Sequence, residues 1–136
     1  MALAFLCAGS IHAATFVPSS TLDTTNASAL RGAIIAANVR GGSNTIVLNE
    51  NTYLLSIPGS QEDAALAGDL DITNGRITII GTSPAKVTIN AAAIADRVFQ
   101  VHPGAQLLLS NIAVTGGKAV NGLASGDAGE SGGGIH

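Results

Sequence analysis

Two neighbouring stretches of the chain, 69–90 and 98–117, repeat one pattern of apolar and polar positions. In each, short alternating runs flank a tight turn, Asn-Gly at 74–75 and Pro-Gly at 103–104. Alignment of the turns pairs Leu70 with Phe99, Asp71 with Gln100, Ile72 with Val101, Ile77 with Leu107, and Ile79 with Leu109. Short strands that recur at a period of about 30 residues indicate a β-solenoid, in which each coil buries its apolar face against the next.

The alternation within each strand divides its residues between a core and a solvent face. The predicted core positions are Leu70, Ile72, Ile77, Ile79, Val87, Ile89, Phe99, Val101, Leu107, Leu109, Ile112 and Val114. Asp69, Asp71 and Thr73 take the opposite face, so we expect them to contact solvent and Asp71→Asn to change stability little. A slip of one residue would bury Asp71, and the register is therefore well specified.

One segment before the repeat has the period of an α-helix. Its apolar positions are Leu30, Ala33, Ile34 and Ala37. We predict a helix over 28–40, with Ser28 as the N-cap and Gly41 just beyond the end. We expect this helix to cover the open end of the solenoid, where unpaired strand edges would otherwise promote aggregation.

Further strands are expected before the repeat, at 15–17, 44–48 and 52–56. Residues 60–67 are acidic and then small, which predicts a protruding loop. The chain then divides into an N-terminal cap over 14–68 and coils over 69–136. The glycine-rich end carries Gly-Gly-Gly-Ile at 132–135, which reads as the start of another coil. We therefore expect the sequence to be the N-terminal piece of a longer protein, with an unknown number of missing coils.

Composition favours an exported protein. Charged residues make up 11% of the chain, well below the average of about 25%. The net charge is −3, and the six Lys and Arg residues are scattered, so no basic stripe is available for nucleic acid. Residues 1–13 resemble the remnant of a signal peptide, although no Lys or Arg precedes the apolar core, so the true start codon is open. The single cysteine, Cys7, lies in this segment, and no run is long enough to span a bilayer.

The order of several motifs resembles a known bacterial region. These motifs are Ser28-Ala29-Leu30-Arg31-Gly32-Ala33-Ile34, Ala37-Asn38, Asn44-Thr45-Ile46-Val47-Leu48, Thr52-Tyr53, Asp69-Leu70-Asp71-Ile72, Thr78-Ile79-Ile80-Gly81, Arg97-Val98-Phe99-Gln100-Val101, Leu109-Ser110-Asn111-Ile112 and Gly132-Gly133-Gly134-Ile135. The order from residue 15 onward is similar to the CSLREA-type N-terminal region of secreted and outer-membrane proteins with a pectate-lyase-like β-helix. In this chain Ser28-Ala29 replaces the signature's Cys-Ser, and Gly32 replaces its Glu. The resemblance implies a right-handed parallel β-helix on a surface or secreted protein, either adhesin-like or enzymatic.

Candidate chemistry is sparse. Asp69 and Asp71 are two residues apart on one strand and could ligate Ca²⁺, but the next coil offers Val98 and Gln100 there, so a solvated face is the simpler interpretation. Related polysaccharide lyases use Ca²⁺, which keeps the ion as the only cofactor considered. The chain presents no other cofactor or metal motif.

Other polar residues are better explained by structure than by catalysis. Asp96 and Arg97 could serve as an acid and a substrate-binding cation, but we expect Arg97 to form a surface ion pair with Asp69 from the neighbouring coil. His102 has no predictable partner and reads as a turn residue. Asn90 and Asn111 lie near strand corners, where asparagine commonly bonds to backbone. The glycine motif around Gly126-Asp127 lacks the spacing of calcium nonapeptides.

Two main functions remain. The first is a non-enzymatic exported scaffold, the N-terminal part of an adhesin-like or outer-membrane passenger protein that contacts carbohydrate or a host or cell-surface ligand through later coils. The second is the non-catalytic N-terminal part of a carbohydrate-active lyase or hydrolase whose site lies in those coils. No catalytic, cofactor-binding or metal residue is assigned, and the oligomeric state is open.

Overall fold

The computed structural model describes residues 13–59, 62–83 and 86–118. The predicted signal segment up to residue 12 and the glycine-rich end from residue 119, including the motifs at Gly126-Asp127 and 132–135, lie outside the described residues. The described chain forms the strands β1 (Ala14–Phe16), β2 (Ser43–Leu48), β3 (Asn51–Leu54), β4 (Leu70–Ile72), β5 (Arg76–Gly81), β6 (Val87–Asn90), β7 (Phe99–Val101), β8 (Gln106–Ser110) and β9 (Ala113–Thr115), and the helix α2 (Leu30–Arg40).

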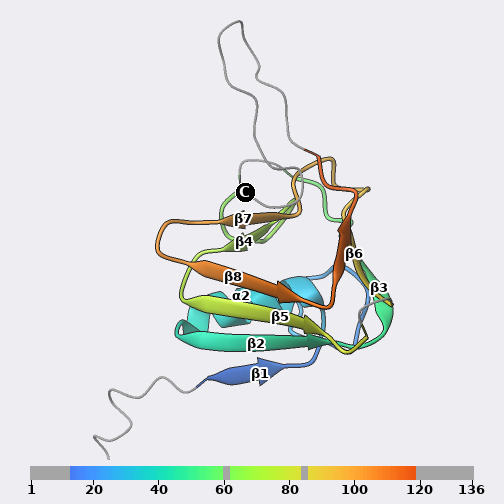
Figure 1. Ribbon diagram of the computed structural model, residues 1–136. Helices are drawn as coiled ribbons and strands as arrows, with labels where there is room; N and C mark the ends of the chain where they lie inside the picture. The colour runs from blue at the N-terminus through green and yellow to red at the C-terminus, as the bar shows by residue number, and fades with distance from the viewer. Residues whose placement is uncertain (1–12, 60–61, 84–85, 119–136) are drawn as a thin grey trace, which may run out of the picture.

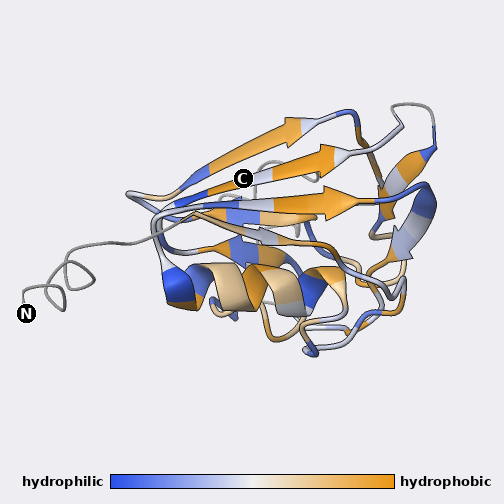
Figure 2. Ribbon diagram, turned by 90° about the horizontal axis from the view of Figure 1, so that it is seen from below, coloured by the Kyte–Doolittle hydropathy of each residue, from blue (hydrophilic) through white to orange (hydrophobic). Residues whose placement is uncertain are grey.

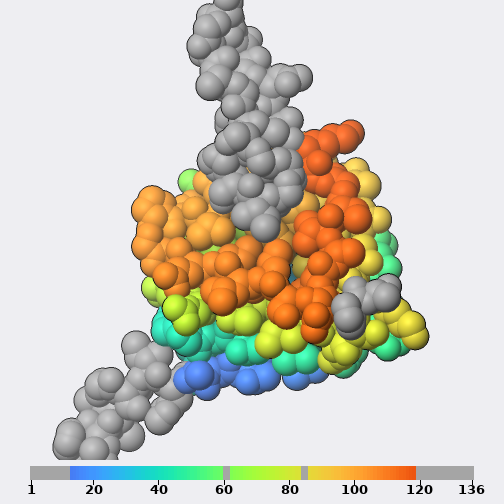
Figure 3. Space-filling view, viewed as in Figure 1, coloured from blue at the N-terminus to red at the C-terminus, as the bar shows by residue number. Residues whose placement is uncertain are grey.

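The strands form three parallel sheets, in the orders β1-β2-β5-β8, β3-β6-β9 and β4-β7. β2, β3 and β4 make one coil, β5, β6 and β7 make the next, and β8 and β9 begin a third. In Figure 1 the strands of the first sheet are stacked from β1 at the bottom to β8. The space-filling view shows the same order as bands of colour from blue to red (Figure 3). The chain is therefore a parallel β-helix, as the repeat predicted.

The register agrees with the alignment of the two turns. Leu70 pairs with Phe99, and Ile72 pairs with Val101. In the first sheet, Ile77 pairs with Leu107 and Ile79 with Leu109. The stacked coils begin before residue 69, where the repeat in the sequence starts. β2 pairs with β5, and β3 pairs with β6. The predicted cap and coils therefore share continuous sheets.

The inward positions form apolar columns along the solenoid. Leu70, Ile72, Ile77, Ile79, Val87, Ile89 and Phe99 are fully buried. The remaining predicted positions, Val101, Leu107, Leu109, Ile112 and Val114, are partly buried and pack against this core. Burial of each aliphatic side chain stabilises the fold by about 1.5–3 kcal/mol before the cost of ordering the chain. The core prediction is confirmed, with burial that decreases toward β8 and β9.

α2 packs against β4 and β2, which both belong to the first coil. Viewed from below, it lies alongside the strands at the β1 end (Figure 2). Leu30, Ala33, Ile34 and Ala37 are buried, as the periodicity predicted. The predicted cap is wrong: the N-cap is Ala29, with no side-chain capping hydrogen bond. Gly41 follows the helix at φ 68°, and its N–H donates to Ala37 O.

The described part of the predicted protruding loop, residues 62–67, instead packs against the coils through Ala65. Ala65 is fully buried at φ 60°. The Glu62 carboxylate accepts hydrogen bonds from Leu66 N and Ala67 N at 2.7 and 2.9 Å. Gly68, at φ 64°, must be glycine because a Cβ there would lie 2.3 Å from Gly59 O. These contacts bring the loop over the start of β4.

Candidate functional site

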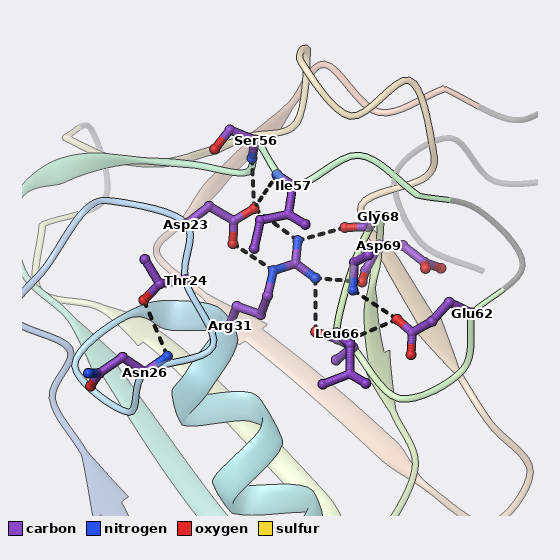
Figure 4. Close-up of polar contacts among 12 residues, drawn as sticks. Asp23, Thr24, Asn26, Arg31, Ser56, Ile57, Glu62, Leu66, Gly68 and Asp69 are labelled. Carbon is purple, nitrogen blue, oxygen red and sulfur yellow. Dashed lines mark hydrogen bonds and ion pairs between the residues drawn. The ribbon is translucent and has the colours of Figure 1, made fainter.

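Buried polar side chains gather around the start of β4. The first group centres on Arg31 of α2, which is fully buried. Its guanidinium donates to Ala65 O at 2.9 Å and to Gly68 O at 2.7 Å, so the helix holds the segment that leads into β4 (Figure 4). It also donates to both oxygens of Asp23, from Nε at 2.6 Å and from Nη2 at 3.0 Å.

Asp23 completes this group. Its Oδ2 accepts hydrogen bonds from Ser56 N at 2.7 Å and Ile57 N at 2.9 Å. Burial alone would raise the pKa of Asp23, but the hydrogen bonds from Arg31 and the two amides outweigh it and hold the pKa below its usual value. We name Arg31 and Asp23 the arginine clamp. Because both charges are paired and hydrogen-bonded, the clamp joins the helix to three loop segments, and its role is structural.

The second group is acidic. Asp69, Asp71 and Asp96 are 2%, 0% and 0% exposed, and we name them the acidic cluster. Arg97 Nε lies 3.2 Å from Asp69 Oδ2 and 3.6 Å from Asp96 Oδ1. The Oδ2 atoms of Asp69 and Asp96 are buried and accept no hydrogen bond from the described residues. The cluster therefore holds carboxylate oxygens whose hydrogen-bonding capacity is unused.

The surroundings favour protonation of Asp69 and Asp71. Burial, and then the charges of Asp71 and Asp96, raise the pKa of Asp69 to about 7, against the opposing charge of Arg97. Burial also raises the pKa of Asp71, although a hydrogen bond with His102 opposes the shift. A cluster with these properties can hold a proton or a cation near neutral pH.

Asp71 lies at the centre of the contacts between loop and coils. Its Oδ1 is 2.9 Å from His102 Nε2, and its Oδ2 accepts a hydrogen bond from Ala65 N at 2.9 Å. The ligand atoms of Asp63, Asp71 and His102 all lie within 4.8 Å of one another. His102 itself is fixed by a backbone hydrogen bond from its N–H to Ile72 O.

The predicted solvent face of β4 is wrong. All three residues of β4 are buried, and so is Asp69 before it. The reason is tertiary: Ala65 from the packed loop contacts Asp71, and Arg97 from the next coil contacts Asp69. Ionisable groups from outside the matching positions of the next coil also reach these aspartates: Asp63 and His102 lie next to Asp71, and the charge of Asp96 acts on Asp69.

The outcomes for the other polar residues differ. Arg97 pairs with Asp69 across neighbouring coils, as predicted, but the pair is buried rather than exposed. His102 is a turn residue with a partner, Asp71. Asn90 accepts a hydrogen bond from Ala92 N, and Asn111 adopts φ 59°, so both shape corners of the chain.

Sequence reasoning missed the arginine clamp. Arg31 directly follows Leu30 on a helix that is otherwise apolar on this side, and a charge beside a buried stripe is a signal for a buried partner. The partner could not be found from spacing, because Asp23 lies in an irregular loop. Asn44 was missed in the same way: it is 2% exposed, and its Nδ2 donates to Gly41 O at the end of the helix.

Comparison with protein-family models, with curated proteins and with solved structures finds no match to the chain. Among the described residues, no helix has the length and apolar character needed to cross a membrane.

Proposed function

We propose that the chain is the capped N-terminal part of an exported, non-enzymatic β-helix scaffold, of the kind found in adhesin-like or outer-membrane passenger proteins. The observation that carries the proposal is the difference between inward and outward positions. Inward positions remain apolar from coil to coil, as in Ile46, Ile79 and Leu109. Outward positions change chemistry between partners, as Thr78 does with Leu108. A scaffold needs a repeated core, whereas a catalytic groove needs a defined set of polar groups on its outer surface.

The buried ionisable groups agree with this proposal. A polysaccharide chain must reach the carboxyls that act on it, since a general acid works at hydrogen-bond distance. Asp71 and Asp96 are fully buried, so neither presents a carboxyl to a substrate on the surface. The capping helix at the β1 end supports a role in starting and protecting the stack of coils. Binding of carbohydrate or of a host or cell-surface ligand would then belong to coils beyond this piece.

Export is tested with a reporter that is active only outside the cytoplasm. Residues 1–30 are placed before alkaline phosphatase in a bacterial host, with and without two lysines added after Met1. We expect export and cleavage after Ala13, located by N-terminal sequencing. Leu6→Asp, which interrupts the apolar core, should abolish the signal. Retention of both fusions in the cytoplasm would contradict the proposal.

The non-enzymatic role is tested by incubating the chain with polygalacturonate and with alginate and measuring the release of new chain ends. We expect no turnover. Depolymerisation that is lost in Asp69→Asn or Asp96→Asn would reject the scaffold proposal. It would also contradict the alternative, in which this chain is the non-catalytic N-terminal part of a carbohydrate-active β-helix enzyme. Asp63→Asn, an exposed carboxylate next to the cluster, serves as the matched control.

A further inference from the structure

Three potential ligands from three separate segments converge at the corner after β7. Asp63 comes from the packed loop, Asp71 from β4, and His102 from the turn that follows β7. Asp71 pairs with Gln100, and His102 follows just after the end of β7, where its Nε2 lies 2.9 Å from Asp71 Oδ1. The fold therefore brings together one imidazole nitrogen and two carboxylates, with all three ligand atoms within 4.8 Å of one another.

These spacings suit a small dication. Zinc lies about 2.0–2.2 Å from nitrogen and oxygen ligands, so two ligands of a tetrahedral site are roughly 3.3 Å apart. His102 Nε2 and Asp71 Oδ1 are 2.9 Å apart, and their backbones are fixed by the pairing of β4 with β7. Asp63 is exposed and can move its carboxylate by rotation of its side chain. Slight adjustment of one mobile side chain therefore completes a three-ligand site.

The charge of the surroundings is an independent observation that points to a cation. Asp69 lies two residues before Asp71 on the chain and is 2% exposed, and Asp96 is fully buried. Oδ2 of each accepts no hydrogen bond from the described residues. Within the described chain, these two carboxylates share the charge of one guanidinium, that of Arg97, while Arg31 is already bound to Asp23. Buried negative charge in excess is costly unless a proton or a cation offsets it.

We propose that Asp63, Asp71 and His102 form a binding site for a divalent transition-metal ion, with zinc as the representative. The imidazole decides the class, because Ca²⁺ and Mg²⁺ prefer oxygen ligands alone. The side chain of His102 is 21% exposed and Asp63 is exposed, so the ion can enter and water can fill its remaining positions. The ion fastens the loop that carries Asp63 to the corner of the second coil. This inference does not depend on the proposed scaffold function.

The test is titration of the full chain, stripped with EDTA, by Zn²⁺ in a calorimeter, with Co²⁺ absorption as a second reporter of coordination. We expect one ion per chain at this site. Asp63→Asn and His102→Gln should each weaken binding by about tenfold or more, since even changes behind a ligand have effects of that size. Glu50→Gln, which alters an exposed carboxylate on another side of the solenoid, should bind as the unmodified chain does.

Several results would overturn the site. They are absence of Zn²⁺ binding, binding that neither variant weakens, and tighter binding of Ca²⁺ than of Zn²⁺. Binding through His12 or His136, which lie outside the described residues, would give the second of these results. Asp63→Asn keeps the test decisive if His102→Gln does not fold, because the Asp63 side chain is exposed. Circular dichroism of each variant establishes that it is folded before titration.

Discussion

β4 and β5 are consecutive strands along the chain, and their residues are buried in different patterns. In β5, buried and partly exposed residues alternate, with Ile77 and Ile79 inward and Thr78 outward. In β4, all three residues are buried, including the aspartate at its centre. Both strands have the same apolar alternation in sequence. The difference arises because the outer face of β5 meets solvent, whereas the packed loop and Arg97 cover the outer side of β4 and Asp69 before it.

The comparison separates two ways of stabilising a coil. The β5 side depends on apolar columns, which tolerate varied outward residues. The β4 side depends on buried charges that must be paired, which makes each of them sensitive to substitution. Substitutions on the two sides should therefore have effects of different origin and different size.

The largest effect is expected in the apolar column. Ile79→Asp puts a carboxylate between Ile46 and Leu109, where no partner is available to it among the described residues. We expect a loss of more than about 4 kcal/mol in the free energy of unfolding, enough to unfold a marginal domain. Urea denaturation followed by circular dichroism measures it. Thr78→Asp, one position away on the outer face, should cost less than about 1 kcal/mol; equal losses would refute the register.

Loss of the arginine clamp should have the second largest effect on the free energy of unfolding. Arg31→Met removes the charge partner of the buried Asp23 carboxylate and the donor to the carbonyls of Ala65 and Gly68. We expect a loss of about 3 kcal/mol in the free energy of unfolding, because the partner charge stays buried. Arg76→Met, at the exposed start of β5, should lose about 0.5 kcal/mol or less. A clamp of no structural importance would give equal values for the two variants.

Asp71 tests the covered face of β4 directly. Asp71→Ala leaves Ala65 N–H without its acceptor and His102 without its partner. We expect a loss of about 2 kcal/mol in the free energy of unfolding, the cost of leaving buried polar groups unsatisfied. Asp71→Asn keeps one acceptor oxygen and should lose less than Asp71→Ala but more than the nearly neutral change that a solvent face would give. Gln100→Ala, its half-buried register partner, should lose under about 1 kcal/mol.

The acidic cluster predicts a dependence on pH. The pKa of Asp69 is about 7 in the folded chain and 3.8 in the unfolded chain. Between these values the folded state holds a proton that the unfolded state has released, so stability falls as pH rises toward 7. For one such group the slope is about 1.4 kcal/mol per pH unit.

Urea denaturation in EDTA at several pH values between 4.5 and 8 measures this slope. Asp69→Asn should flatten it and be more stable than the unmodified chain above pH 7. Because burial also raises the pKa of the neighbouring Asp71, the informative quantity is the difference between the two slopes. Asp63→Asn is the control, and an unchanged slope in Asp69→Asn would exclude the buried carboxyl as its cause.

The smallest effect is expected on the solvent face. Lys86 Nζ lies 3.6 Å from Glu50 Oε2, with side chains 65% and 53% exposed. Water and salt screen this pair, so Lys86→Ala should change the free energy of unfolding by about 0.5 kcal/mol or less. The same urea measurement in low and high salt checks it. A loss as large as that of Arg31→Met would remove the distinction between exposed and buried charge.

The sequence by itself determined the solenoid, its register and its core. Pairings such as Leu70 with Phe99 follow from period 2 within strands and a repeat between coils, and both are local properties that survive in the fold. The helical face of Leu30 and Ala37 was readable for the same reason. The positions that are apolar in both repeats are the ones that pair with each other in neighbouring coils.

Only the tertiary structure decided which polar groups are buried and which of them meet. Asp23 and Arg31, like Asp71 and His102, come together through irregular loops whose paths no periodicity encodes. Alternation placed Asp71 on the outer face of β4 and therefore in solvent. This face is buried because the loop that carries Ala65 folds back over it. Alternation reports the direction in which a side chain points, whereas burial depends on what the rest of the chain lays over it.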